Sequence, residues 1–159
     1  MEESTLKYWK DAGHVARRTL EAMKLELTPG KTFHEVIESA ERYIHRHGGK
    51  PAFPGTIAVN DLAAHFTTDH NVNPVEGWEG EMVLQKGDCV KIDFGVHIKG
   101  HIADNALTFE IGNGNEHTEQ IKAAKEARDA AIEMLHPGTP WYKVGQAAAQ
   151  PSLDAGFQP

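Results

Sequence analysis

Apolar residues recur every three or four positions in the first part of the chain, which is the spacing of one stripe along a helix. The first stripe predicts a helix of about twenty residues. It comprises Leu6, Trp9, Gly13, Ala16, Leu20, Met23 and Leu27. Thr32, with Glu35 three residues later, is typical of a capping box that begins a second helix. The apolar stripe of that helix comprises Phe33, Val36, Ile37, Ala40 and Ile44.

The pattern changes after the second helix, where prolines and polar residues replace the apolar stripe. Residues 50–60 place two prolines around Phe53 and end in alternating apolar positions, which predicts a stiff loop entering a short strand. His65 follows among small residues and, taken alone, is more typical of a core histidine than of a catalytic one. Residues 69–80 are polar and predict an exposed loop.

A β-hairpin is predicted over residues 90–109, which read VKIDFGVHIKGHIADNALTF. Lys99 and Gly100 separate two β-rich arms, and glycine readily takes the positive φ that a tight turn demands. A two-residue loop places Ile98 opposite His101. The apolar side chains of the arms then share one face, which we expect to pack against helices. They are Ile92, Phe94, Val96, Ile98, Ala103 and Leu107.

The same register places two carboxylates on the other face of the hairpin. Asp93 and Asp104 become diagonal neighbours, within about 8 Å of each other. Like charges repel more strongly as water is excluded, and a bound cation would relieve that repulsion. Gly95, opposite Asp104, leaves room for one. Two alternatives stay open: both carboxylates lie on a hydrated sheet face, or a three-residue loop shifts the register and separates them.

Two more helices are predicted after the hairpin. Residues 117–135 are rich in Ala, Glu and Lys, which favour helix. Thr139 before Pro140 is typical of the start of a fourth helix, running toward Ala149. We expect Pro151 to interrupt that helix, because proline has no backbone N–H to donate.

Length and composition indicate a single globular domain spanning residues 1–159, with 40% apolar and 25% charged residues. No apolar run reaches the length of a membrane span, and the N-terminus has no secretory signal, so we expect a cytoplasmic protein without a membrane partner. The single cysteine, Cys89, excludes an internal disulfide. The formal net charge of -7 argues against a nucleic-acid partner.

Several short motifs resemble the N-terminal half of type 2 methionine aminopeptidases, the archaeal and eukaryotic branch of the pita-bread metallopeptidases. These motifs are Lys50-Pro-Ala-Phe-Pro, Asn60 with Ala63-Ala64-His65-Phe66, and the hairpin segments Val90-Lys-Ile-Asp-Phe-Gly-Val-His and Gly100-His-Ile-Ala-Asp. The resemblance implies an α+β fold, half of the pita-bread fold, with hairpin 90–109 in an antiparallel sheet packed against helices.

The resemblance also implies an activity and a site. The activity is the removal of the initiator methionine, so the substrate would be a peptide with an N-terminal Met. Asp93 and Asp104 would bind metal, with Asp93 bridging two ions of Co, Mn, Fe or Zn. His65 would act in catalysis by contacting the substrate near the scissile carbonyl, and Phe53 would help to line the methionine pocket.

The family completes its metal shell with one histidine and two glutamates from a second half, which this sequence does not contain. We therefore expect weak or partial metal binding, and little or no activity of this chain alone. The partner would be the missing C-terminal half or a second copy in a homodimer. The alternative is a non-catalytic, engineered or reconstructed half-domain that serves as a folding or protein-interaction scaffold.

Overall fold

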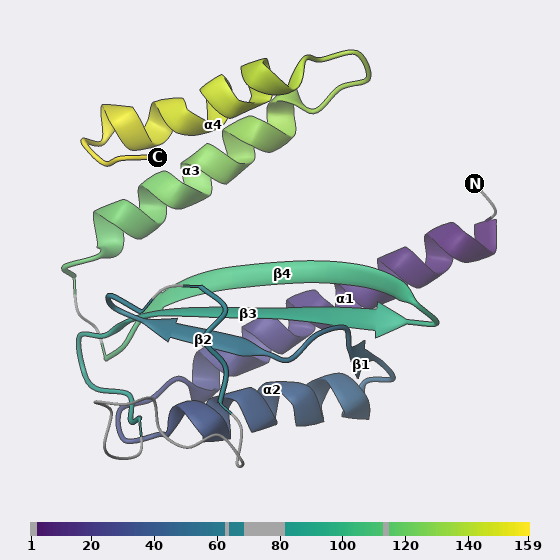
Figure 1. Ribbon diagram of the computed structural model, residues 1–159, viewed down its shortest axis with the longest axis vertical. Coiled ribbons are helices and arrows are strands. Elements are labelled where there is room, and N and C mark those ends of the chain that lie inside the picture. The colour runs from purple at the N-terminus through teal and green to yellow at the C-terminus, as the bar shows by residue number, and fades with distance from the viewer. Residues whose placement is uncertain (1–2, 63, 69–81, 113–114) are drawn as a thin grey trace. The chain divides into compact units, whose positions relative to one another are not determined.

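The computed structural model describes residues 3–62, 64–68, 82–112 and 115–159 (Figure 1). The predicted loop over residues 69–80 lies entirely outside these ranges. The described elements are α1 (Glu3–Glu26), α2 (Phe33–Arg46), β1 (Lys50–Pro51), β2 (Thr56–Val59), β3 (Cys89–Ile98), β4 (His101–Glu110), α3 (Thr118–Met134) and α4 (Trp141–Asp154). The chain forms two compact units, Met1–Asn113 and Gly114–Pro159. Its mixture of helices with an antiparallel sheet confirms the predicted α+β class.

The predicted hairpin is present with the predicted register. β3 and β4 pair antiparallel over ten residues each, with Ile98 opposite His101 and Gly95 opposite Asp104. Lys99 and Gly100 both have positive φ, 50° and 81°. Two such residues make a turn whose twist matches that of the flanking strands, which explains why a two-residue loop sets this register.

β3 is the central strand of the described sheet. β4 pairs with all of it, so β1 and β2 share its other edge. β2 pairs with the first part of β3 and places Thr56 opposite Asp93, whereas β1 pairs near its end, with Pro51 opposite Val96. The middle of β3 is therefore hydrogen-bonded on both edges, which holds the backbone on either side of Asp93.

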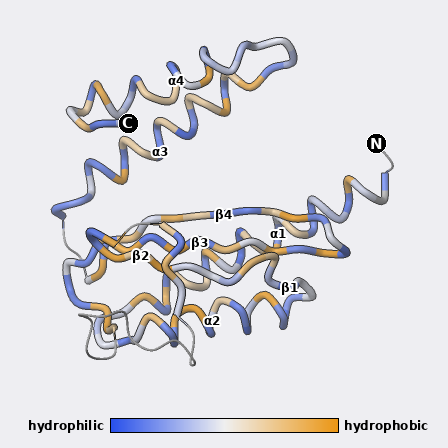
Figure 2. Tube along the Cα trace, viewed as in Figure 1, coloured by the Kyte–Doolittle hydropathy of each residue, from blue (hydrophilic) through white to orange (hydrophobic). Residues whose placement is uncertain are grey.

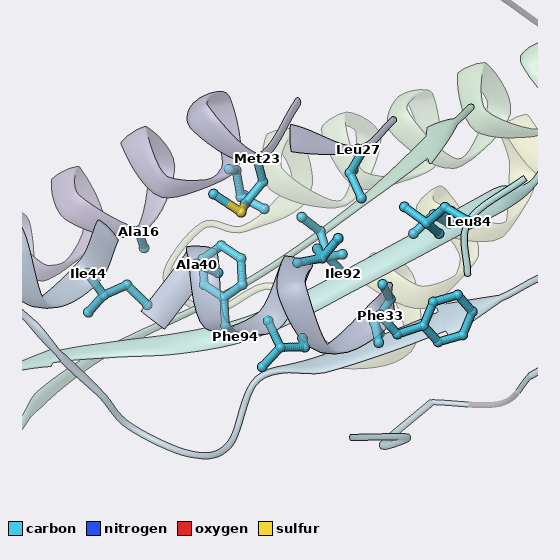
Figure 3. Packing of buried hydrophobic residues seen from close by; sticks show 14 of the residues in the cluster. Ala16, Met23, Leu27, Phe33, Ala40, Ile44, Leu84, Ile92 and Phe94 are labelled. Atoms are coloured by element: carbon cyan, nitrogen blue, oxygen red, sulfur yellow. The ribbon is translucent and has the colours of Figure 1, made fainter. Parts of the chain in front are cut away.

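Helices α1 and α2 cover one face of this sheet and enclose the core (Figure 3). The five apolar residues predicted for α2 are all buried, and Figure 2 shows apolar and polar positions alternating along this helix. The same cluster contains Met23 from the last turn of α1 and Leu27 just after this helix, together with Ile92 and Phe94 of β3.

The stripe predicted for α1 is only partly correct. Leu6 and Trp9 remain 43% and 42% exposed, and the buried side of the helix includes Ala12, Val15 and Thr19 instead of Gly13. Trp9 packs edge-on against His101, the first residue of β4. Leu6, almost one turn earlier, therefore lies beyond the end of the strand, where there is no sheet to cover it.

The capping box at the start of α2 is confirmed. The Glu35 amide donates to Thr32 Oγ1 at 3.1 Å, and the Thr32 amide donates to the Glu35 carboxylate at 2.9 Å. The hydrogen bond from the Thr32 amide, and then the Thr32 hydroxyl, hold the pKa of Glu35 below its usual value, because both stabilise the charged carboxylate. This carboxylate is thus fully used in holding a helix end.

The second unit is a pair of helices, and it corrects two predictions. The N-cap of α4 is Pro140 rather than Thr139, and it offers no side-chain hydrogen bond. Pro151 does not interrupt α4, which continues to Asp154. Proline at this position removes the hydrogen bond to the Ala147 carbonyl and crowds that carbonyl, a cost that the packing of α4 against α3 can offset. In the part of the chain that the structure describes, no helix has the length and apolarity of a membrane span.

Candidate metal centre

A pocket of about 400 Å³ lies against the sheet face opposite the helices, because Asp93 alternates with the core residues of β3. It brings together all four residues that the sequence singled out, Phe53, His65, Asp93 and Asp104, although they come from four separate segments. The full lining is Phe53, Pro54, Thr56, His65, Thr67, Asp93 and Asp104.

Asp93 is the most unusual group in this pocket. Its Oδ1 atom is buried and has no hydrogen-bond partner among the described residues. Burial raises the pKa of the Asp93 carboxyl, the neighbouring Asp104 carboxylate raises it further, and His65 opposes the change. A buried oxygen without a partner costs free energy. A cation bound to this carboxylate oxygen would supply the interaction that it lacks.

The prediction that Gly95 leaves room for a cation is wrong at that position. The space where a Gly95 side chain would project is filled by the Phe53 ring and the Ala52 methyl group. The polypeptide after β1 runs across β3 at this point, with the Ala52 amide donating to the Gly95 carbonyl at 2.9 Å. A cation at this site would therefore lie beside the two carboxylates, over the part of the pocket that Phe53 leaves open.

His65 reaches the pocket from a short segment fastened along β2. The Ile57 amide donates to the Phe66 carbonyl at 2.9 Å, and Thr67 Oγ1 donates to the Gly55 carbonyl at 2.7 Å. His65 itself has a φ of 70°, a left-handed conformation that costs a residue with a side chain about 1 kcal/mol. Both hydrogen bonds involve residues just after His65, and they hold against β2 the segment that brings His65 to the pocket.

Three further pocket residues, Pro54, Thr56 and Thr67, were not predicted from the sequence. Thr56 lies opposite Asp93 on the neighbouring strand and so shares its face. Detecting it required the register between β2 and β3, which are about thirty residues apart in sequence and leave no local signal of their pairing.

Residues 7–159 match metallopeptidase family M24. The chain belongs to this family. It is 38% identical over 148 residues to the methionine aminopeptidase of Thermococcus onnurineus, covering 93% of this chain and 47% of that protein. It is 36% identical over 159 residues to the methionine aminopeptidase of Archaeoglobus fulgidus, covering 100% of this chain and 51% of that protein. The chain thus spans about half the length of these curated relatives.

The fold agrees with this family. The structure of methionine aminopeptidase from Rickettsia prowazekii superimposes with a TM-score of 0.81 at 21% identity, covering 97% of this chain and 61% of that one. At this identity the match establishes the fold alone. The chain therefore has the α+β arrangement of the pita-bread peptidases over the part that it shares with them.

Membership of family M24 implies a divalent metal cofactor, and the pocket chemistry fits one. Asp93 and Asp104 offer carboxylate oxygens, one of them buried without a partner. Such oxygens bind Mn and, with other donors, Co, Fe or Zn. Within the described residues, however, no three His, Cys, Asp or Glu side chains are grouped to hold an ion. The two carboxylates by themselves would therefore fill only part of a coordination shell.

Proposed function

We propose that this chain is the N-terminal half of a dinuclear-metal methionine aminopeptidase that removes the initiator methionine from new polypeptides in the cytoplasm. One observation carries the proposal. The buried Oδ1 of Asp93, which has no hydrogen-bond partner in the part of the chain that the structure describes, lies in the same pocket as Asp104, His65 and Phe53. A cation is the partner that this arrangement lacks, and a peptide N-terminus is the substrate that the family relationship favours.

Each pocket residue has a role in this proposal. Asp93 and Asp104 would hold the metal, whose contribution is to lower the pKa of a bound water and to polarise the scissile carbonyl. Pairing with β2 on one edge of β3 and with β4 on the other keeps Asp93 in place. His65 would contact the substrate near the scissile carbonyl, and Phe53 would supply an apolar wall for the methionine side chain.

The number of metal ligands that this chain offers predicts that the site depends on a second polypeptide. Two carboxylates cannot complete a four-coordinate ion, and a dinuclear site needs still more ligands. We therefore propose that this chain alone binds metal weakly and has little or no activity. Further ligands would come from a complementary half or from a second copy of this chain. If a second copy supplies them, activity should rise with the concentration of this chain alone. If a complementary half supplies them, it should not.

Titration with Mn²⁺ tests the site, with free Mn²⁺ followed by electron paramagnetic resonance. Asp104→Asn should weaken binding by about tenfold or more, since even changes around a metal's ligands have effects of that size. Asp129→Asn is the matched control, because it removes the same charge from an exposed position on α3 and should bind as the wild type does.

Methionine release from a short Met-Ala peptide, with added Co²⁺ or Mn²⁺, tests the activity. Any turnover should vanish in Asp104→Asn. If the wild type and Asp129→Asn bind no more Mn²⁺ than Asp104→Asn, the proposed metal site is wrong, and the non-catalytic scaffold becomes the better interpretation.

A further inference from the structure

Gly95 occupies a position on β3 where only hydrogen fits. A Cβ atom built there would lie 2.8 Å from Cδ1 of Phe53, closer still to Cε1, and 2.9 Å from the Ala52 methyl carbon. Ordinary carbon contacts begin near 3.4 Å. The Phe53 ring therefore rests on the bare backbone of Gly95.

Backbone conformation does not explain this glycine. Gly95 does not have the positive φ found at glycines such as Gly87 and Gly100. It is paired within the sheet, opposite Asp104. A residue with a side chain could adopt the same extended conformation, and most would favour it. Space for the neighbouring segment is thus the physical reason that remains for glycine here.

The segment that rests on Gly95 is held from both ends. On one side, β1 pairs with β3, and the Ala52 amide donates to the Gly95 carbonyl. On the other side, Pro54 restricts the chain immediately after Phe53. With its backbone fixed in this way, Phe53 can give way to an added atom at Gly95 only by turning its ring, and that movement changes the wall of the pocket.

We propose that Gly95 is a positioning residue that sets the shape of the side-chain subsite by seating the Phe53 ring against β3. The inference rests on the proposed function, because it takes the apolar part of the pocket as the site of the methionine side chain. Gly95 would act on selectivity among unbranched and small N-terminal side chains, through Phe53, without contacting the metal.

The first test asks whether Gly95 acts through Phe53. Urea unfolding midpoints are compared for the wild type, Gly95→Ala, Phe53→Leu and the double variant. Gly95→Ala should lower the midpoint, and it should do so by less than half as much when Phe53 is already leucine. The Ala52 methyl group remains in both backgrounds, so the rescue is partial.

Two other outcomes of this four-protein comparison also test the inference. Additive effects would overturn the inference, because they would mean that the added methyl group is resisted by something other than the ring. If Gly95→Ala does not fold, a cooperative transition in the double variant supports the inference. Its absence there, with Phe53→Leu folded, overturns it.

The second test measures selectivity, which a merely structural role would not change. Saturation-transfer NMR follows L-methioninamide and L-alaninamide binding to the Zn²⁺-loaded chain. Gly95→Ala should weaken methioninamide by about tenfold, the scale of a misfitted apolar side chain, and leave alaninamide and Zn²⁺ affinity unchanged. Gly13→Ala is the control, since it adds the same methyl group on α1 with nothing within 4 Å.

The outcomes separate this inference from the proposed function. Loss of Zn²⁺ affinity in Gly95→Ala, or methioninamide affinity within twofold of the wild type, overturns the inference while the metal site stands on the Asp104→Asn result. Zn²⁺ binding without any methioninamide binding in the wild type overturns the subsite assignment and this inference with it.

Discussion

The two faces of β3 use the same strand for opposite purposes. On the helical face, Ile92, Phe94 and Val96 are at most 1% exposed and pack into the main core. On the other face, Asp93 carries a buried oxygen without a partner among the described residues, and Gly95 gives up its side-chain space to Phe53. The helical face is a packed apolar core, whereas the other face departs from ordinary packing at two positions within three residues, Asp93 and Gly95. Such concentrated violations are expected where function, rather than stability, selects the residues.

Two carboxylates show the same contrast. Glu35, at the start of α2, accepts a backbone hydrogen bond, and its pKa is lowered. In Asp93 the pKa is raised, mainly by burial and then by Asp104. The first carboxylate is stabilised by the fold that it supports. The second is destabilised by the fold, and in the proposed function it is reserved for a metal.

The largest expected effect comes from the helical face. Phe94→Ala should lower the free energy of unfolding by about 3–5 kcal/mol, because it opens a cavity in a core where Phe94 is 1% exposed. Ile102→Ala is the control on the opposite face, 52% exposed, and should cost less than about 1 kcal/mol. Urea unfolding measures both. Equal costs would mean that the two faces are not energetically distinct.

A smaller effect of opposite sign is expected at His65. His65→Gly should leave stability unchanged or raise it by up to about 1 kcal/mol, because glycine adopts a φ of 70° without strain. The same change should weaken methioninamide binding, because His65 lines the pocket.

Asn60→Gly is the matched comparison for His65→Gly, since Asn60 also has a positive φ of 51°. Its side chain, however, bonds both the Asp88 carboxylate and the Cys89 amide at 2.9 Å. This variant should lose about 1 kcal/mol of unfolding free energy. A loss of stability in His65→Gly as large as that in Asn60→Gly would make His65 a structural residue.

The smallest effects are those of pH on the metal-free protein in EDTA. A lowered pKa means that Glu35 adds stability above its unfolded pKa, and that this stability is lost as pH falls through the folded value. Glu35→Gln should thus be less stable than the wild type at pH 7, with the gap closing in acid. Gln keeps the capping geometry, so the gap isolates the charge.

Asp93 should behave in the opposite way. Its raised pKa means that the folded wild type loses stability as pH rises from the usual Asp value through the folded one. Asp93→Asn should therefore be more stable than the wild type at pH 7, and the two should converge in acid. Urea unfolding midpoints between pH 4 and pH 8 give the stability difference between the wild type and each of the two variants. Differences of the same sign for Glu35→Gln and Asp93→Asn would contradict the contrast between the carboxylates.

Local patterns predicted much of this molecule. The capping box located the start of α2, and the turn residues Lys99 and Gly100 set the register that places Asp93 and Asp104 on one face. These features depend on residues a few positions apart, where turn geometry and helix capping act directly. The family motifs added Phe53 and His65, whose place in the pocket no periodicity indicated.

Predictions that depended on distant segments were less reliable. The exposed start of α1 depends on where β4 begins, and the pocket residue Thr56 depends on the pairing of β2 with β3. The expectation that Gly95 leaves room for a cation was wrong, since the space above it belongs to Phe53, more than forty residues earlier. At Pro151, a local rule failed because the helix tolerated the loss of one hydrogen bond.

By itself the sequence determined the hairpin, its register and the pairing of two carboxylates, because hydrogen bonding across a two-residue turn leaves one alternation of side chains. Only the tertiary structure decided what surrounds those carboxylates. The folding of β1, β2 and the His65 segment onto β3 buries Oδ1 of Asp93, fills the space over Gly95 and forms the walls of the pocket. Burial is a property of segments that meet in space, so no single stretch of the chain could reveal it.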